Sequence, residues 1–516
     1  MNARGPLGEW LAALRTADES PPTVPKFAVA ARDALGDTQL RRNLRTATAT
    51  MSRLRVTAAG ELDDWAELRA AGQAIKDHTL LNLDTYLEEL ERSVTEAGGM
   101  VHWARDADDA CAIVTGLVAA TGQAEVVKVK SMVGQEIGLN DALEAAGIRP
   151  YETELAELIV QLGADRSTHS LLPAIHRSRA EIRELFLREL PDPPADLGDE
   201  PAQLAAAARG YLRDVFRTAK VAISGANFAV ADTGTLVVLE AEGNGRMSVT
   251  LPETLITVIG IEKVVPTWSD LEVFLQLLPR SSVGERMTPY VSTWTGVAPG
   301  DGPRAFHLVL LDNGRTNALA DEVGRAALRC IRCSACLDVC PVYERTGGAA
   351  YGPVHPGPIG AILTPQLRGP ESPHDASLPY ASTLCGACAD VCPVRIDIPR
   401  ILVHLRGKVI ESRRRRPVPT PEMAMMRSVA WTLGDGGRYE AALRQTTRWA
   451  RLVARGGRIQ RLPGLFGKWT DARDLPAPPK ESFRVRWQHR AGLPVRRGAL
   501  GAPGGPRMGR LRRSSG

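Results

Sequence analysis

The chain has 516 residues, 44% of them hydrophobic, and a formal net charge of +5 at neutral pH. That length predicts roughly three domains, and the apolar content is sufficient for buried cores. Residues 482–516 carry nine arginines and no acidic residue, so the rest of the chain has a net charge of −4. The basic character therefore belongs to the tail.

The sequence shows no sign of a membrane span or of a secretion signal. No run approaches the ~18 consecutive apolar residues that a membrane-spanning helix requires. The start of the chain lacks a cleavable apolar stretch, and Asp18 and Glu19 soon follow Arg15. We therefore expect a cytoplasmic protein.

The first half of the chain predicts an α/β domain after a helical start. Residues 1–64 are expected to form polar helical segments without a core of their own, and residues 64–96 form an amphipathic helix that ends at Gly98-Gly99. The expected strands are apolar and cover residues 100–103, 126–129, 235–239, 255–259, 290–294 and 306–311. Helices are expected between them at residues 136–146, 202–219 and 269–278. This alternation predicts a parallel sheet covered on both faces, in a domain over residues 65–315.

Two short features inside that domain allow separate predictions. Asn244-Gly245 lies between strand-like segments and is a strong signal for a turn. Cys111 lies in the apolar stripe of a helix, where a lone cysteine usually acts as a small buried hydrophobic residue.

The other seven cysteines lie in two runs that each end in proline. The runs are Cys330-Cys333-Cys336-Cys340-Pro341 and Cys385-Cys388-Cys392-Pro393. Cysteines three residues apart wrap three thiolates round one cubane iron–sulfur cluster, and the fourth thiolate comes from elsewhere. The sequence therefore predicts a mainly α-helical, ferredoxin-like domain over residues 316–412 that holds two 4Fe-4S clusters.

In two-cluster ferredoxins, the cysteine before the proline ligates the cluster of the other run. That rule assigns Cys330, Cys333, Cys336 and Cys392 to the first cluster, and Cys340, Cys385 and Cys388 to the second.

The second set is one thiolate short, because Ser382 stands where the first run has Cys330. The fourth iron then takes Ser382 or water as its ligand, is open to a substrate or partner, or is absent. An iron without a thiolate can act as a Lewis acid. The simpler alternative is a cluster held by three thiolates that only relays electrons.

Other uses of cysteine fit the two runs less well. Structural zinc sites take four ligands in closed tetrahedral sets, which seven cysteines with two proline endings do not match. Disulfides require an oxidising compartment, which nothing else in the sequence suggests.

The C-terminal part is expected to be helical at residues 423–452 and extended after residue 467, within a segment over residues 413–487. Arg413 to Arg416, followed by two prolines, predict a linker. Residues 488–516 predict a disordered Arg-rich tail. No recognition motif accompanies those arginines, so a nucleic-acid partner is not expected.

Four features together resemble one family. These are KSMVGQEIGLNDALEAAGI (130–148), SGANFAVADTGTLVVLEAEGNGR (224–246), the two cysteine runs, and GKWTDARDLPAPPKESF (467–483). From about residue 35 to 487 the chain resembles the lactate utilization protein B family of bacterial iron–sulfur proteins. The cysteine runs alone are shared with many electron carriers, and the other motifs make the resemblance specific.

The resemblance implies a role in the cytoplasmic oxidation of L-lactate to pyruvate. It implies two companion proteins, a cysteine-rich subunit and a second α/β subunit, and two cubane clusters on the cysteine sets given above. The resemblance also implies that members of the family lack the same fourth thiolate. It further implies that the α/β domain is similar to the CoA-transferase and sugar-phosphate-isomerase fold. On this basis we expect an electron-transfer subunit without independent enzymatic activity.

The α/β domain offers weaker candidates for a site. It has neither a GxGxxG fingerprint nor a P-loop. One hypothesis is a carboxylate cradle, in which backbone N–H groups of Asp232 to Thr235 approach the anion or Arg246 binds it bidentately. The alternative is an ordinary strand entry and hairpin turn. Lys128 and Lys130 are expected on one solvated or partly covered face of a strand, and His355 in a capping or core role. No catalytic base is assigned.

Two other functions compete with lactate oxidation. In the first, the complex oxidises glycolate or another small 2-hydroxy acid, because such acids present the same carboxylate and hydroxyl groups as lactate. Alternatively, the chain is a non-enzymatic iron–sulfur redox sensor.

Overall fold

The computed structural model describes residues 24–165, 169, 172–352, 354–415, 421–462, 464, 467–470, 473–479 and 481–491. The first part of the predicted N-terminal segment, residues 1–23, and the predicted tail beyond residue 491 lie outside the described residues. The chain divides into two compact units, Met1–Ser412 and Arg413–Gly516. In the part of the chain that the structure describes, no helix is both long and apolar enough to span a bilayer.

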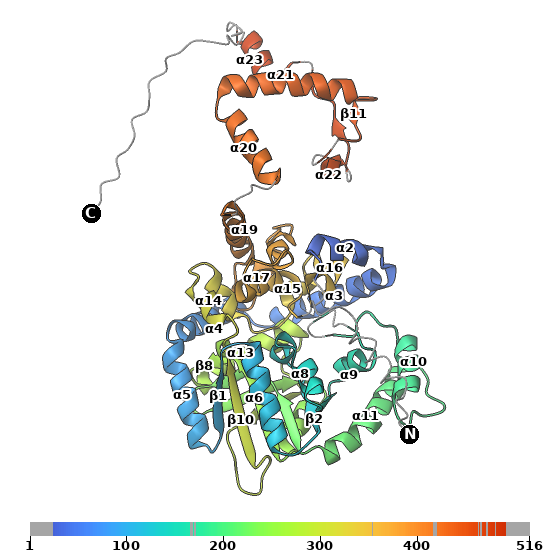
Figure 1. Ribbon diagram of the computed structural model, residues 1–516, viewed down its shortest axis with the longest axis vertical. Coiled ribbons are helices and arrows are strands. Elements are labelled where there is room, and N and C mark those ends of the chain that lie inside the picture. Colours follow the sequence, from blue (N-terminus) through green and yellow to red (C-terminus); the bar gives the residue numbers. More distant parts are fainter. Residues whose placement is uncertain are drawn as a thin grey trace, which may run out of the picture. The chain divides into compact units, whose positions relative to one another are not determined.

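The first unit contains a parallel sheet of six strands, in the order β1-β10-β7-β4-β2-β3. Strands β1, β10 and β2 of this sheet are labelled in Figure 1. The strands are β1 (Met100–Ala104), β2 (Glu125–Lys128), β3 (Arg149–Glu152), β4 (Val221–Ser224), β7 (Thr254–Gly260) and β10 (Ala305–Leu311). Every pair in this sheet is parallel, and Val258 lies opposite Val309 at its centre. All four residues of β4 are buried, as expected for a central strand covered on both faces.

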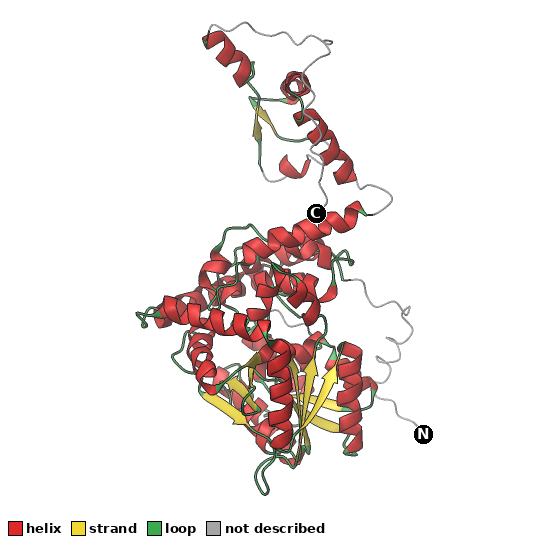
Figure 2. Cartoon of the chain, turned by 90° about the vertical axis from the view of Figure 1, so that its left-hand side faces the viewer, coloured by secondary structure: helices red, strands yellow, loops and turns green. Residues whose placement is uncertain are grey.

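Helices cover both faces of this sheet (Figure 2). One face packs against α6 (Ala107–Ala120), α7 (Met132–Glu136) and α8 (Leu139–Ala145). The opposite face packs against α5 (Leu83–Glu96), α9 (Leu155–Leu162), α10 (Arg179–Glu189) and α11 (Pro201–Thr218). Along β10, Val309 belongs to the first layer and Leu308 to the second, which is the alternation that a strand requires. The predicted parallel sheet with helices on both faces is confirmed.

A second sheet of four strands has the order β8-β5-β6-β9. Its strands are β5 (Phe228–Val230), β6 (Thr235–Glu240), β8 (Val264–Val265) and β9 (Tyr290–Trp294). The β5–β6 and β6–β9 pairs are antiparallel. The predicted strands at 235–239 and 290–294 therefore exist, but they lie outside the parallel sheet.

Three sequence predictions are wrong in detail. Asn244-Gly245 begins helix α12 (Asn244–Thr250) instead of a turn between strands, because Glu240 accepts the N–H groups of Gly243 and Arg246 and caps the helix. The helix predicted at 64–96 is two helices, α4 (Trp65–Leu81) and α5, that meet at Asn82.

The helix predicted at 136–146 begins later, as α8 at Leu139, and Glu136 is instead the last residue of α7. Gly138 separates them with a φ of +66°, a conformation that glycine adopts without strain. Cys111 lies half-buried on α6, packs against the apolar layer there, and directs its Sγ toward the carbonyl of Ile137 at 3.3 Å.

The cysteine segment is mainly helical. Its elements are η2 (Gly324–Arg329), α15 (Ala335–Asp338), α16 (Tyr343–Thr346), η3 (Ala349–Tyr351), α17 (Gly357–Arg368), η4 (Asp375–Tyr380), α18 (Ala387–Val391) and α19 (Ile398–Arg414). Arg413 and Arg414 are thus part of a helix, contrary to the prediction that a linker begins there, and residues 416–420 lie outside the described residues. The helix that precedes the cysteine segment along the chain is α14 (Arg315–Ala320).

The cysteine segment shares one apolar core with elements from elsewhere in the unit. Leu44 of α3 (Thr38–Ala59), Phe274 of α13 (Trp268–Ser282) and Phe228 of β5 pack in the same cluster as Leu337 and Ile362. Helix α2 (Phe27–Gly36) contacts η3. The N-terminal helices therefore contribute to the core that supports the cysteines.

The second unit contains α20 (Pro421–Leu433), α21 (Gly436–Val453), α22 (Gly467–Thr470), α23 (Phe483–Arg490) and a short antiparallel pair, β11 (Arg458–Ile459) with β12 (Leu475–Pro476). The helix predicted at 423–452 is interrupted because Asp435 caps the start of α21.

Candidate metal centre

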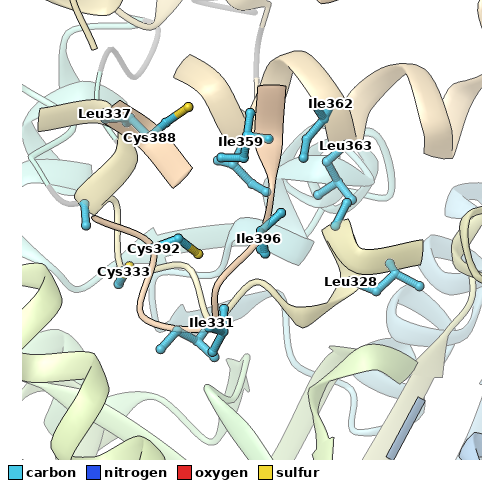
Figure 3. Packing of buried hydrophobic residues seen from close by; sticks show 14 of the residues in the cluster. Leu328, Ile331, Cys333, Leu337, Ile359, Ile362, Leu363, Cys388, Cys392 and Ile396 are labelled. Atoms are coloured by element: carbon cyan, nitrogen blue, oxygen red, sulfur yellow. The ribbon is translucent and has the colours of Figure 1, made fainter. Parts of the chain in front are cut away.

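A cavity in the first unit is lined by four of the seven clustered cysteines. These are Cys330, Cys333, Cys336 and Cys392, so the cavity joins the first run to the last cysteine of the second. Its other walls are mainly apolar, with Ile331, Ile359, Val394, Ile396 and Ile398 among them (Figure 3). The sequence rule that pairs the proline-linked cysteine with the other run matches this arrangement of side chains.

The backbone of the first run is shaped to turn its side chains inward. Arg332 and Ser334 have φ values of +62° and +64°, which non-glycine residues seldom adopt and which mark a tightly wound loop. The N–H of Arg332 points to the Sγ of Cys330 at 3.4 Å. Backbone N–H groups directed at sulfur are among the interactions that stabilise bound iron–sulfur clusters.

The remaining three cysteines form a second group. A Cys385 thiolate raises the pKa of Cys340 and of Cys388, a Cys340 thiolate raises that of Cys388, and a Cys388 thiolate also raises the pKa of Cys336 in the first group. Cys340 and Cys388 are buried, whereas Cys385 is exposed. The second group therefore lies nearer to solvent on one side.

The thiols differ in acidity for physical reasons. Burial raises the pKa of Cys388 to about 12 and that of Cys392 to about 11, and it also raises the pKa of Cys333 and Cys336. The pKa of Cys385 is lowered instead, mainly because its sulfur accepts a hydrogen bond from the backbone N–H of Ala387. A metal that binds the buried thiols has to displace their protons, as thiolate ligands require.

The hydroxyl of Ser382 has a local hydrogen-bond partner. Its Oγ accepts the backbone N–H of Leu384 at 3.0 Å. The side chain that reaches Cys385 is that of Thr383, whose hydrogen bond lowers the pKa of this thiol. Sequence alignment of the two runs singled out Ser382 and missed Thr383, because it carries no information on which side chain faces the sulfur.

The carboxyl ends of the parallel strands meet the cysteine segment through a buried ion network. Glu136 follows β2, Glu262 follows β7 and Arg315 follows β10. Arg315 binds both carboxylates, and Arg332 of the cysteine loop lies 3.6 Å from Glu262. No sequence motif predicts that Glu136, Glu262 and Arg315 meet, because these residues are far apart along the chain.

Histidine 355 belongs to the same network. His355 is buried, its Nε2 lies 3.1 Å from Glu136, and its Nδ1 lies 3.4 Å from Arg332. It also lines the cysteine cavity. These contacts agree with the predicted core role.

The predicted carboxylate cradle has other local functions. Gly234 packs so closely against the end of α5 that a Cβ there would lie 2.7 Å from the backbone nitrogen of Val94. Thr235 is hydrogen-bonded to Thr295 at 2.6 Å. Arg246 stacks over the ring of Tyr290 with a 5.0 Å separation. The glycine is thus required by chain packing, which a sequence motif cannot distinguish from an anion site.

Lysine 128 is fully buried, contrary to the predicted solvated or partly covered face. Its side chain is 2% exposed, and its Nζ lies 2.5 Å from Oε1 of Glu152 on the neighbouring strand. Lys130 is largely covered as well, 3.8 Å from Glu154 and 3.9 Å from Glu157. The reason is that helices cover both faces of the sheet, so alternation along β2 does not separate core from solvent.

Among the described residues, no three His, Cys, Asp or Glu side chains converge as the ligands of a single ion would. A cubane cluster instead needs sulfur donors distributed round four irons in an enclosed space. The four thiols and apolar walls of the cavity fit that requirement in donor chemistry.

Three segments of the chain match models of known families. Family models match as "LUD domain" at residues 87–310, "4Fe-4S dicluster domain" at 326–396 and "Lactate utilisation protein B, C-terminal" at 407–492. Lactate utilization protein B of Oceanobacillus iheyensis is 41% identical over 88% of this chain and 94% of its own. The protein of the same name in Bacillus subtilis is 40% identical over 83% of this chain and 89% of its own.

A crystal structure of a DUF162 family protein from Deinococcus radiodurans aligns with 44% of this chain and 98% of its own, at 14% identity and a TM-score of 0.24.

Fold and site together define an α/β protein with a 4Fe-4S dicluster domain, and this domain supports iron–sulfur cluster binding. The chain belongs to the lactate utilization protein B family.

Proposed function

We propose that this chain is the iron–sulfur electron-transfer subunit of a cytoplasmic complex that oxidises L-lactate to pyruvate. The observation that carries the proposal is the cavity that brings Cys392 to Cys330, Cys333 and Cys336. The names of its relatives supply the link to lactate.

In this proposal Cys330, Cys333, Cys336 and Cys392 hold one 4Fe-4S cluster, and Cys340, Cys385 and Cys388 hold a second. Such clusters, when bound, supply transfer of one electron at a time. The chain itself provides the thiolates, surrounds the first group mainly with apolar side chains, and leaves the second group accessible at Cys385.

Removal of two electrons from a 2-hydroxy acid by one-electron carriers needs more than one acceptor. In this proposal the two cysteine groups hold two clusters, so one chain supplies two one-electron acceptors. We further propose that two companion proteins, a cysteine-rich subunit and a second α/β subunit, complete the oxidising complex.

The test begins with anaerobically reconstituted protein. Iron, inorganic sulfide and the electron paramagnetic resonance of the reduced protein are measured, and zinc or an absence of metal would contradict the iron–sulfur assignment. The protein is then mixed with the two companion proteins, and reduction of its clusters is followed with L-lactate, D-lactate and glycolate. The proposal expects L-lactate to reduce the clusters. Reduction by glycolate alone would mean that glycolate, and not lactate, is the substrate of the complex.

A further inference from the structure

Helix α3 is a concentration of positive charge within an acidic part of the chain. Residues 413–516 carry 24 basic and 6 acidic residues, so residues 1–412 have a formal net charge of −13. Within this acidic part, α3 contains five arginines and no acidic residue. A negatively charged partner is therefore repelled by most of the first unit and attracted to this helix.

The packing of α3 determines which of its arginines face outward. Leu44 is fully buried in the core that supports the cysteines. Arg55 is also buried, and its Nη2 donates to a backbone carbonyl at the end of α18 at 2.9 Å. Arg42, Arg45 and Arg53 are exposed. One side of the helix is thus held by the cysteine segment, and the other side presents cations to solvent.

Two hollows lie along the outward side of α3. One has a volume of about 470 Å³ and extends along the helix to Thr57, and the other has a volume of about 340 Å³ and begins at Thr38. Arg45 and Glu344 line both hollows, which therefore form one groove. A helix rises 1.5 Å per residue, so the groove follows about 29 Å of the helix axis. We call it the α3 groove, and its cations are Arg41, Arg42, Arg45, Arg53 and Arg345.

The acidic residues of the α3 groove do not balance its arginines. Two carboxylates line it, those of Asp338 and Glu344. Asp338 is buried, and its Oδ1 lies 3.7 Å from Nε2 of His169. Within the described part of the chain, the four exposed arginines of the groove take part in no ion pair. Five arginines against two carboxylates leave an excess of three positive charges.

The α3 groove adjoins the cysteine segment through α16. Glu344 and Arg345 belong to this helix, which follows Cys340 along the chain. The N–H of Glu344 donates to the carbonyl of Cys340 at 3.0 Å, and the N–H of Tyr343 points to its Sγ at 3.5 Å. A partner seated in the groove therefore contacts the helix whose first turn is bonded to a proposed cluster ligand.

The dimensions and lining of the α3 groove favour one kind of occupant. Its arginines are spread along the helix and do not converge on a point, as a single small anion would require. Single-stranded nucleic acid needs aromatic rings for stacking, and none of the described residues that line the groove is aromatic. A protein segment with spaced carboxylates fits both the length and the charge, because arginine binds carboxylates through paired hydrogen bonds.

We propose that the α3 groove is the docking surface for an acidic segment of a partner protein. The carboxylates of that segment bind the exposed arginines of α3 and α16. The inference deepens the proposed function and rests on it for the partner, since a companion protein of the complex has to reach the cysteine segment. The binding itself requires no cluster. Contacts between exposed charges of this kind direct association and weaken as salt is added.

The experiment uses the full chain with the photo-cross-linking residue p-benzoylphenylalanine in place of Ala49, which is exposed and lines the groove. The probe is a peptide of glutamate and alanine of about 20 residues, which spans about 30 Å as a helix. A peptide with glutamine in place of glutamate is its control. Residues 413–516 also attract acidic peptides, but cross-linking from position 49 reports on the groove alone. The yield at increasing peptide concentration gives the half-saturating concentration.

The variants change the groove charge in both directions. Arg45→Gln combined with Arg53→Gln removes a cation on each side of position 49 and is expected to raise the half-saturating concentration about three- to tenfold. Glu344→Gln removes a carboxylate and is expected to lower that concentration about twofold, an effect that a damaged fold would not produce. Arg209→Gln combined with Arg213→Gln is the matched control, because both arginines are exposed on α11 outside the groove, and it should leave the value unchanged.

Three results would overturn the inference. They are equal cross-linking of the glutamine peptide, unchanged binding in the Arg45→Gln and Arg53→Gln variant, and weaker binding in Glu344→Gln. Stronger cross-linking of a single-stranded oligothymidylate than of the acidic peptide would also overturn it and would make nucleic acid the occupant. Protein that binds no iron on reconstitution but shows the expected order of peptide binding would contradict the proposed function and support the docking surface.

Discussion

Arg315 and Glu136 form a bidentate buried ion pair, with Nη1–Oε1 and Nη2–Oε2 distances of 2.9 and 3.1 Å. Arg315 is 1% exposed and also binds Glu262. Removal of the shared cation leaves two buried carboxylates without their main partner. Arg315→Met is therefore expected to lower the free energy of unfolding by about 3–5 kcal/mol, measured by urea denaturation. Arg304→Met, at an exposed arginine just before β10, should change it by less than about 0.5 kcal/mol.

The same network predicts an acid-sensitive fold. Burial opposes ionisation of Glu262, but Arg315, Lys263 and Arg332 outweigh it and lower its pKa to about 2. Because the folded pKa lies below the ordinary value of 4.5, the stabilisation is present above pH 4.5 and is lost as the pH falls through 2. Glu262→Gln should thus flatten the fall in unfolding free energy between those two pH values. An unchanged slope in the variant would show that this carboxylate does not contribute.

Glu154 is expected to behave in the opposite way. Burial raises its pKa to about 7, and Glu242 and Glu157 add to the rise while Lys130 opposes it. Since the folded pKa lies above the ordinary value of 4.5, the stabilisation is complete below pH 4.5 and is lost as the pH rises through 7. Glu154→Gln should match the unaltered protein near pH 4 and be more stable by roughly 1–3 kcal/mol near pH 8. Denaturation at both pH values, with the exposed Glu96→Gln as control, checks this.

The sequence predicted those features that depend on local pattern. Apolar runs separated by helical periods specify a parallel sheet with two covered faces, and the strands at β7 and β10 fall within a residue or two of the predicted positions. Cysteine spacing likewise grouped the side chains that line the cavity.

Features that depend on distant contacts were missed. Lys128 was predicted on a solvated or partly covered face because its partner, Glu152, lies on another strand and carries no matching signal. Arg55 and Arg69 precede the cysteines by hundreds of residues, so only the fold shows that they bind the carbonyls of Val391 and Cys392.

Exposed and buried cysteines should differ in reactivity before iron is bound. Cys385 is exposed and has a lowered pKa, whereas burial raises the pKa of Cys388 to about 12 and also raises that of Cys111. Because the thiolate is the reactive form, iodoacetamide should label Cys385 first in iron-free protein. Mass spectrometry of timed samples measures the order. Faster labelling of Cys111, which lies outside both groups, would contradict the electrostatic account.

Cys392→Ser should separate the two cysteine groups. It removes one thiolate from the cavity shared with Cys333, so the signal of that cluster should be lost or altered, with up to about half of the iron. The altered spectrum should match that of Cys333→Ser and differ from that of Cys385→Ser, because the crossing cysteine belongs to the first group. Cys111→Ser is the control and should retain all iron, since its Sγ faces the carbonyl of Ile137 on the α/β side. A Cys392→Ser spectrum like that of Cys385→Ser would mean that each run holds its own cluster and that the crossed assignment is wrong.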